Sequence, residues 1–309
     1  MERPFVSVIV PNYNHARFLD MRISSILKQT YTNYEIIILD DMSTDNSIDI
    51  IQKYRNNKHV SHIVVNNVNS GSTFKQWKTG FELSKGELIW IAESDDSCTP
   101  ELLTTLVNEF ENDSKCVLAF CRSVKIDINN NIINESGLDK DLHMEGQCFI
   151  KHYLSRHNYI SNASSTIFKK DVLSMIDWSF STYRGNGDWL VWIEISRLGN
   201  VAYVNRPMNY FRIHGTNTTA KLAFNGKGEI ESAELYKYLR KKKYIGFKEE
   251  FRARISHIYT IKYGKQHKLY NKETKKTLIS AWNTNVLIEF IDWMAYIIHK
   301  TLGINIIKR

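Results

Sequence analysis

Residues 88–96 read Leu88-Ile89-Trp90-Ile91-Ala92-Glu93-Ser94-Asp95-Asp96, an apolar run that leads directly into an acidic cluster. An uninterrupted run of this kind is typical of a strand buried in a parallel sheet. Carboxylates that follow such a strand are costly to bury unless they bind a cation or another partner. Paired carboxylates suit Mg²⁺ or Mn²⁺. The alternative is that one aspartate caps the helix expected at 100–110 while the other faces solvent.

The sequence before this stretch repeats the order of strand followed by helix. Three apolar runs predict further strands, at 5–10, 35–39 and 62–65, and helical periodicity predicts helices at 18–29, 43–54 and 74–83. Alternating strands and helices imply an α/β fold with a doubly wound, mostly parallel sheet flanked by helices. Ligands of such sheets bind beyond the carboxyl ends of the strands. Three polar clusters fall there: Pro11-Asn12-Tyr13-Asn14, Asp40-Asp41 and Asp95-Asp96.

The sequence after this stretch changes character near residue 220. Further strands are expected at 117–124, 164–168 and 201–203, with a helix at 189–197. Residues 221–309 contain 19 Lys and Arg against 8 Asp and Glu, whereas residues 1–220 contain 22 against 25. Helical periodicity continues at 230–244 and 249–263, and 285–299 predicts a strongly apolar helix. We therefore expect an α/β domain over 1–220 and a basic helical C-terminal extension over 221–309.

Composition and missing motifs exclude several classes of protein. The net charge of +8 resides in the extension, so it does not favour a nucleic-acid binder. A dinucleotide oxidoreductase requires GxGxxG after the first strand, and this pattern is absent. The four cysteines form no CxxC pair, and no export signal precedes them, so we expect a reducing, cytoplasmic location. No apolar run is long enough to span a bilayer.

Three segments, in this order and strand context, resemble those of the family 2 glycosyltransferases: Val8-Ile9-Val10-Pro11-Asn12-Tyr13-Asn14, Ile38-Leu39-Asp40-Asp41-Met42-Ser43-Thr44-Asp45 and Ile91-Ala92-Glu93-Ser94-Asp95-Asp96. The resemblance covers about residues 5–215 and is strongest to bacterial enzymes of surface-polysaccharide synthesis. It implies a GT-A fold and transfer of a sugar, with inversion, from a nucleotide diphospho-sugar held by Mn²⁺ or Mg²⁺.

The resemblance also assigns roles on the donor side. Pro11 and Tyr13, with Asn14 beside them, would frame the nucleotide base, and Asp40 would hydrogen-bond it. Asp95 and Asp96 would serve the ribose, the phosphates and the metal. The segment Tyr210-Phe211-Arg212-Ile213-His214 resembles the Arg-x-His of the family, so His214 would complete the metal shell and Arg212 would orient the loop.

Two departures from the family pattern concern charge. Glu93 stands where the family commonly has aspartate, which alters the reach of that carboxylate. After Asn69-Ser70-Gly71 the usual Ala-Arg-Asn is replaced by Lys75-Gln76-Trp77-Lys78. Lys75 or Lys78 would supply positive charge toward the diphosphate; the alternative is an ordinary solvated helix face, with Trp77 in the core.

The segment Gly187-Asp188-Trp189 resembles the part of the family that carries the general base, so Asp188 would deprotonate the acceptor hydroxyl. Its alternative role is to cap the following helix. Asn162 and Ser164 would lie on the acceptor side, although small polar residues before a strand are equally typical of turns.

These observations predict an inverting transferase that moves a sugar from a UDP-sugar to a hydroxyl of a glycan or lipid-linked glycan. A dTDP-sugar is the less favoured donor. The extension would lie on the inner face of the cell membrane, with a core or homodimer helix as the alternative. Two competing functions stay open: a catalytically silent sugar-binding or scaffold subunit, and a sugar nucleotidyltransferase.

Overall fold

The computed structural model describes residues 3–160, 162–215, 226–264 and 270–282, together with single residues between 290 and 301. The chain forms two compact units, each built from several segments. We call them the sheet unit (Met1–Gly146, Tyr159–Ser181 and Val191–His214) and the helical unit (Gln147–Asn158, Thr182–Leu190 and Gly215–Arg309). The boundary predicted at residues 220 and 221 lies outside the described residues.

The first half of the sheet unit is a parallel sheet. Its strands follow the order β3-β2-β1-β4 and span Val60–Val65, Tyr34–Asp40, Val6–Asn12 and Leu88–Ile91. The pairs β1–β2, β2–β3 and β1–β4 are all parallel. This is the doubly wound opening that the sequence predicts, and its register places Asn12 opposite Asp40 at the carboxyl edge.

The second half of the sheet is mixed. Strand β9 (Thr166–Lys169) runs antiparallel to both β4 and β6 (Cys116–Ile126), and β6 pairs in parallel with β10 (Asn200–Arg212). Three short strands complete it: β5 (Ser97–Cys98), β7 (Ile132–Ser136) and β8 (Leu142–Glu145). The α/β architecture is confirmed, with β9 separating two parallel parts.

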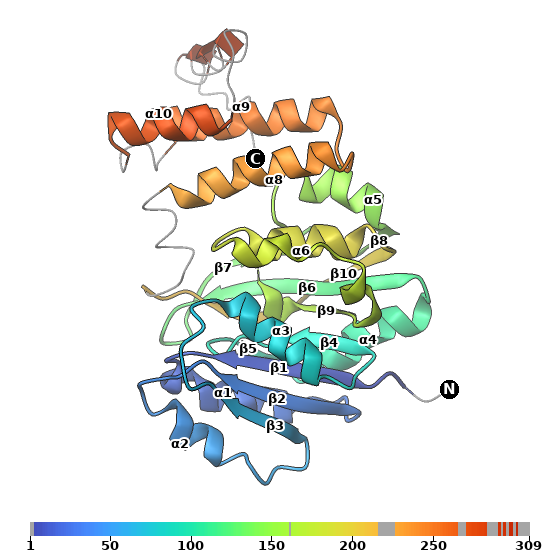
Figure 1. The fold of residues 1–309 in the computed structure, drawn as a ribbon. Helices are drawn as coiled ribbons and strands as arrows, with labels where there is room; N and C mark the ends of the chain where they lie inside the picture. Colours follow the sequence, from blue (N-terminus) through green and yellow to red (C-terminus); the bar gives the residue numbers. More distant parts are fainter. Residues whose placement is uncertain are drawn as a thin grey trace. The chain divides into compact units, whose positions relative to one another are not determined.

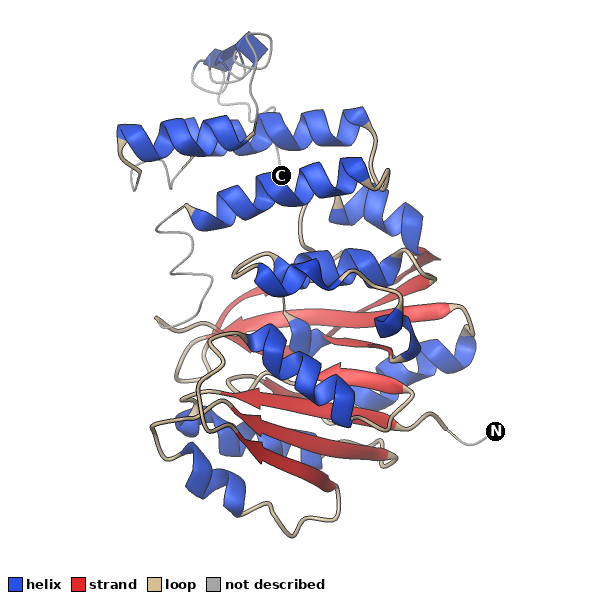
Figure 2. Cartoon of the chain, viewed as in Figure 1, coloured by secondary structure: helices blue, strands red, loops and turns tan. Residues whose placement is uncertain are grey.

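Helices cover both faces of this sheet (Figure 2). Its helices are α1 (Ala16–Leu27), α2 (Ser47–Gln52), α3 (Thr73–Leu83) and α4 (Leu102–Asn112), with short 3₁₀ turns at Ala163–Ser165, Asp171–Ser174 and Trp178–Thr182. Alternate residues of β1 serve the two faces, as expected for a strand. Val8 and Val10 join the core shared with α1 and α4, whereas Ile9 faces Gly80 of α3. The fully buried β1 explains why its sequence is continuously apolar.

The helical unit contains three successive helices, α8 (Lys227–Lys241), α9 (Phe247–Tyr263) and α10 (Lys272–Ala281), labelled in Figure 1. Aromatic rings join them: His257 stacks on Trp282 at 4.4 Å between ring centroids, and Tyr236 contacts both. The same unit includes the π-helical turn Ile150–Leu154, which follows α5 (Gly146–Phe149), and the start of α6 (Gly187–Ser196).

The helices predicted at 230–244 and 249–263 are confirmed as α8 and α9. Most of the apolar helix predicted at 285–299 falls outside the described residues. Within the described part of the chain, the helices are all too short or too polar to cross a bilayer.

Gly80→Ala is expected to destabilise the protein, because the new Cβ would lie 2.5 Å from Ile9 Cγ2. Overpacking of this kind costs about 1–3 kcal/mol, which exceeds the gain of up to about 1 kcal/mol from replacing a helical glycine. Calorimetric unfolding should show a lower Tm. The matched control is Gly228→Ala in α8, where nothing lies within 4 Å; its Tm should equal or exceed that of wild type. A Gly80→Ala protein as stable as this control would contradict the packing.

Candidate functional site

The carboxyl ends of β1 and β2 are joined by a buried carboxylate. Asp40 is fully buried and accepts hydrogen bonds from Asn12 Nδ2 at 2.7 Å and from the amide and hydroxyl of Ser43 at 2.8 and 2.7 Å. These contacts fix the loop after β1 to the loop after β2. Asp40 thereby positions the Pro-Asn-Tyr-Asn motif, with which it was predicted to bind the nucleotide base.

Within that motif, the side chains have different surroundings. Pro11 is part of buried β1, whereas the Tyr13 ring beyond the strand is 46% exposed. Asn14 has a positive φ of 56°, and its Oδ1 accepts hydrogen bonds from the amide and hydroxyl of Thr44. The structure therefore places Asn14 in the support of the loop and leaves Tyr13 accessible to a ligand.

Asp41 organises the next loop, a role that the sequence did not reveal. Its carboxylate accepts hydrogen bonds from four donors: Asn66 Nδ2, the Ser70 amide, the Ser70 hydroxyl and Gln76 Nε2. Lys75, one turn into α3, is exposed and donates to the Ser70 carbonyl at 3.1 Å. In the sequence, this role was indicated only by the polar residue Gln76 on a helix face that is otherwise apolar.

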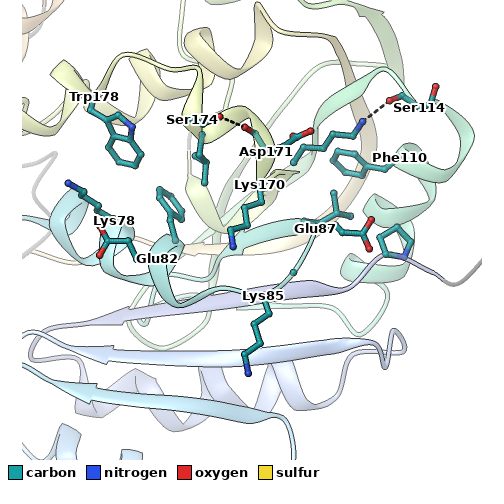
Figure 3. Close-up of a pocket in the computed structure, with 16 residues that line it drawn as sticks. Lys78, Glu82, Lys85, Glu87, Phe110, Ser114, Lys170, Asp171, Ser174 and Trp178 are labelled. Carbon is teal, nitrogen blue, oxygen red and sulfur yellow. Dashed lines mark hydrogen bonds between the residues drawn. The ribbon is translucent and has the colours of Figure 1, made fainter.

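Lys78 lies apart from these loops. It lines a hollow of about 910 Å³ whose walls include Pro4, two residues before β1, and the start of β4, at the amino edge of the parallel strands (Figure 3). Lysines and carboxylates both border this hollow. Trp77 is buried, as expected for a core residue, and its indole N–H donates to Glu93 Oε1 at 3.1 Å.

The acidic loop after β4 contains a fully buried carboxylate, Asp96. Its Oδ2 accepts from Ser164 Oγ at 2.7 Å and its Oδ1 accepts from the Arg212 amide at 2.9 Å. Burial, reinforced by the neighbouring charge of Asp95, raises the pKa of Asp96 to about 7. Ser164, predicted to be on the acceptor side, thus holds the acidic loop, and Asn162 supports it by accepting from the Ser164 amide.

Glu93, at the start of the same loop, also carries a perturbed carboxyl. Burial and the charges of Asp95 and Asp96 raise the pKa of Glu93 to about 8. Arg22 of α1 is fully buried, and its guanidinium lies 4.9 Å from the centroid of the Trp90 ring. Its positive charge partly lowers the pKa of both Glu93 and Asp96. Sequence reasoning missed Arg22, although a charged residue on the apolar face of a predicted helix was a usable signal.

Asp95 and two histidines form a cluster that could hold a cation. The ligand atoms of His15, Asp95 and His214 all lie within 4.8 Å of one another. His214 Nε2 is 2.8 Å from Asp95 Oδ2. Burial alone would raise the pKa of Asp95, but the hydrogen bond from His214 and the charges of both histidines outweigh it and lower the pKa. Two imidazoles and a carboxylate provide the donor set of a divalent metal site.

The composition of this cluster differs in part from the predicted metal set. Asp95 and His214 belong to it, Asp96 lies outside it, and His15 was not foreseen. His15 Nδ1 is 2.8 Å from Ser94 Oγ, which fixes the ring, and burial lowers the pKa of this histidine. The sequence feature that could have identified His15 is its position, directly after the motif that ends the first strand.

Arg212 holds the cluster in place. Its Nε donates to the Asp95 carbonyl at 2.8 Å, and its Nη atoms donate to the Asp127 carbonyl and to Asn130 Oδ1. The guanidinium also lies 4.6 Å from the centroid of the Phe18 ring. These contacts are those expected of a residue that orients the loop.

Asp188 belongs to the helical unit, in the first turn of α6. Its Oδ1 accepts from the Trp189 amide at 2.7 Å and its Oδ2 accepts from Asn158 Nδ2 at 3.4 Å. Burial is the main cause that raises the pKa of Asp188 to about 7. A carboxyl that titrates near neutral pH suits proton transfer at physiological pH.

Comparison with known proteins was made with the whole chain. The profile of "Glycosyl transferase family 2" matches residues 7–174, more than half of the sequence. An uncharacterized glycosyltransferase of Nostoc sp. is 27% identical over 220 residues, which cover 69% of this chain and 66% of that protein. The chondroitin synthase of Escherichia coli is 25% identical over 222 residues, which cover 71% of this chain and 30% of that protein. This chain thus spans less than two thirds of either relative.

Among solved structures, S. aureus TarS 1–349 in complex with UDP-GlcNAc is similar in fold. The TM-score is 0.58 at 15% identity, over 90% of this chain and 71% of that chain. At this identity the likeness concerns the fold alone, which is the GT-A fold with added C-terminal helices.

Alanine at His15 or His214 is expected to weaken Mn²⁺ binding by about tenfold or more, because each change removes a ligand atom. Even the mutation of residues that only support metal ligands lowers metal affinity by about 10–100-fold. Electron paramagnetic resonance of free Mn²⁺ during a titration measures the affinity. His152→Ala removes an exposed imidazole of the helical unit and should bind like wild type. Unchanged affinity in both cluster variants would argue against a cation site.

Proposed function

The chain belongs to glycosyltransferase family 2, and from this premise we propose that it transfers a sugar, with inversion, from a UDP-sugar to a hydroxyl of a glycan or lipid-linked glycan. The observation that carries the proposal is the cluster of His15, Asp95 and His214 beside the strand ends that hold Tyr13. Family membership favours this function over a sugar nucleotidyltransferase and over a silent sugar-binding or scaffold subunit. A dTDP-sugar is the second choice of donor.

The nucleotide would lie against the loop after β1. Tyr13 is accessible for stacking on a base, and Pro11 would form the floor beneath it. Asp40 is fully buried and already accepts three hydrogen bonds from the chain, so it would serve the base indirectly, by holding the loop that carries Tyr13. The structure of TarS with UDP-GlcNAc, a protein of the same fold, supports a uridine nucleotide. Lys75, near the Ser70 carbonyl, would approach the diphosphate, and Lys78 is the weaker candidate.

The residues fit a divalent metal. His15, Asp95 and His214 would bind it, and the two imidazoles favour Mn²⁺ over Mg²⁺, which prefers oxygen ligands. When bound, the metal would neutralise charge that develops on the departing diphosphate. Asp96 would not bind the metal itself. It would support the site by accepting a hydrogen bond from the Arg212 amide, two residues before His214.

Asp188 would be the general base. A sugar hydroxyl is a poor nucleophile until its proton is removed, and a carboxylate opposite the leaving group can accept that proton as the new glycosidic bond forms. The anomeric carbon then exchanges its bond to the diphosphate for one to the acceptor oxygen in a single displacement, which inverts its configuration. Asn158, by donating to Asp188 Oδ2, would favour the charged form.

We infer the acceptor from a relative and the location from the composition of the extension. Chondroitin synthase, by its name, makes a polysaccharide, which supports a growing glycan as the acceptor and surface polysaccharide as the product. Phe290 and Trp293 are 56% and 51% exposed, and the extension that contains them has 19 Lys and Arg against 8 Asp and Glu. Such aromatic and basic residues suit the inner face of a membrane that carries a lipid-linked acceptor. A homodimer is the competing use of these side chains.

Asp188→Asn should lower kcat by about 10²–10⁴-fold while UDP binding in the presence of Mn²⁺ stays unchanged, because an amide cannot accept the proton. Sugar transfer is followed with radiolabelled UDP-sugars, and UDP binding by calorimetry. As a control, Asp171→Asn changes a carboxyl that begins a 3₁₀ turn of the sheet unit and should leave both quantities unchanged. Near-normal kcat in Asp188→Asn would exclude this residue as the base, and failure of wild type to bind UDP, dTDP, GDP or CMP would refute the donor class.

The pH dependence of kcat/KM should report the titration of Asp188. The base works only when deprotonated, so with a pKa of about 7 the rate rises about tenfold per pH unit below 7 and levels off above it. Asn158→Ala removes a hydrogen bond that favours the charged form, so it should move the midpoint to higher pH. A flat profile between pH 5 and 8 would contradict the assignment.

A further inference from the structure

A carboxylate of the C-terminal extension holds the loop that leads into Asp188. Glu231 of α8 accepts hydrogen bonds from three successive backbone amides: Arg184 at 2.7 Å, Gly185 at 2.8 Å and Asn186 at 2.9 Å. Three donors converging on one carboxylate fix the path of the loop, because charge-assisted hydrogen bonds are stronger than neutral ones. All these residues belong to the helical unit.

Asn186 extends this connection to the helix that carries Asp188. Its side-chain amide donates to the Gly228 carbonyl at 3.0 Å and to Ser232 Oγ at 2.9 Å, both on α8. Its own carbonyl accepts from the Leu190 amide at 3.2 Å, which closes the first turn of α6. A continuous series of hydrogen bonds therefore runs from Glu231 through Asn186 to the turn that contains Asp188.

The opposite side of this turn is fixed by the same unit. The Trp189 indole donates to the Leu154 carbonyl at 3.0 Å, and its ring meets Tyr236 of α8 edge-on at 6.1 Å. The Tyr236 hydroxyl donates to the Ser155 carbonyl at 2.8 Å. Asp188 is thus set between two anchors, both of which involve α8.

We propose that Glu231 is a positioning residue for the catalytic base, so that α8 sets the place and direction of the Asp188 carboxylate. The proposal rests on the proposed function of Asp188 as the base. Glu231 touches neither donor nor acceptor in this account, and acts only through the 184–186 loop. The C-terminal extension is therefore part of the catalytic apparatus.

The charge of Glu231 supplies a second, independent readout. Burial is the main cause of the raised pKa of Asp188, and the neighbouring negative charge of Glu231 adds a small further increase. Removing that charge while keeping the shape, as in Glu231→Gln, should lower the midpoint of the kcat/KM profile. A residue that merely stabilised the fold would leave that midpoint in place.

The test compares Glu231→Ala and Glu231→Gln with Glu234→Ala, which removes an exposed carboxylate from the same helix. Glu231→Ala should lower kcat about 10–100-fold, since misplacement of a catalytic group by about 1 Å can cost 10²-fold. The donor KM and the UDP Kd should stay within twofold of wild type. Glu231→Gln should recover part of kcat, and Glu234→Ala should match wild type in every quantity.

A double-mutant cycle decides whether Glu231 acts through Asp188. In an Asp188→Asn background, Glu231→Ala should cause little further loss of kcat, because the group that it positions is already absent. Equal losses in both backgrounds, or kcat in Glu231→Ala equal to that of Glu234→Ala, would overturn the proposal. If Asp188→Asn alone is active, the proposed base is wrong, which is a separate result. If Glu231→Ala does not fold, the loss of kcat in Glu231→Gln, compared between the wild-type and Asp188→Asn backgrounds, decides instead.

Discussion

The sheet unit depends on one buried carboxylate, that of Asp96. It receives the Ser164 hydroxyl and the Arg212 amide, and so joins the end of β4 to the start of β9 and the end of β10. A buried carboxylate without these donors would cost several kcal/mol, so the three segments must come together for any of them to be well placed. The histidine and aspartate cluster is a consequence, since Asp95 precedes Asp96 and His214 lies two residues after Arg212.

Much of the fold could be predicted from sequence because its causes are local. Apolar runs such as 5–10 and 35–39 can only be buried strands when helices alternate with them, and parallel strands bring their ends to one edge. Asp95 was therefore expected at this edge, where it lies beside His15 and His214. The antiparallel insertion of β9 was not predicted, because pairing direction depends on partners more than 40 residues away in the chain.

The details that escaped prediction depend on the direction in which a side chain points, or on contacts between residues that are far apart in the sequence. Adjacent aspartates point in different directions, so Asp95 joins the histidines while Asp96 turns into the protein; spacing alone cannot distinguish them. Asn162 and Ser164 were ambiguous because small polar residues suit turns, and the structure shows them supporting the acidic loop. Glu231 lies 45 to 47 residues from the three amides whose hydrogen bonds it accepts, so only the folded chain brings it to the loop before α6.

The interleaving of the helical unit has a consequence for biosynthesis. Its segments at 147–158 and 182–190 leave the ribosome well before α8, which holds the three amides of residues 184–186. Until α8 emerges, those amides have water as their acceptor, and the first turn of α6 lacks its anchor. A nascent chain would therefore complete its sheet before the turn that contains Asp188 is anchored to α8.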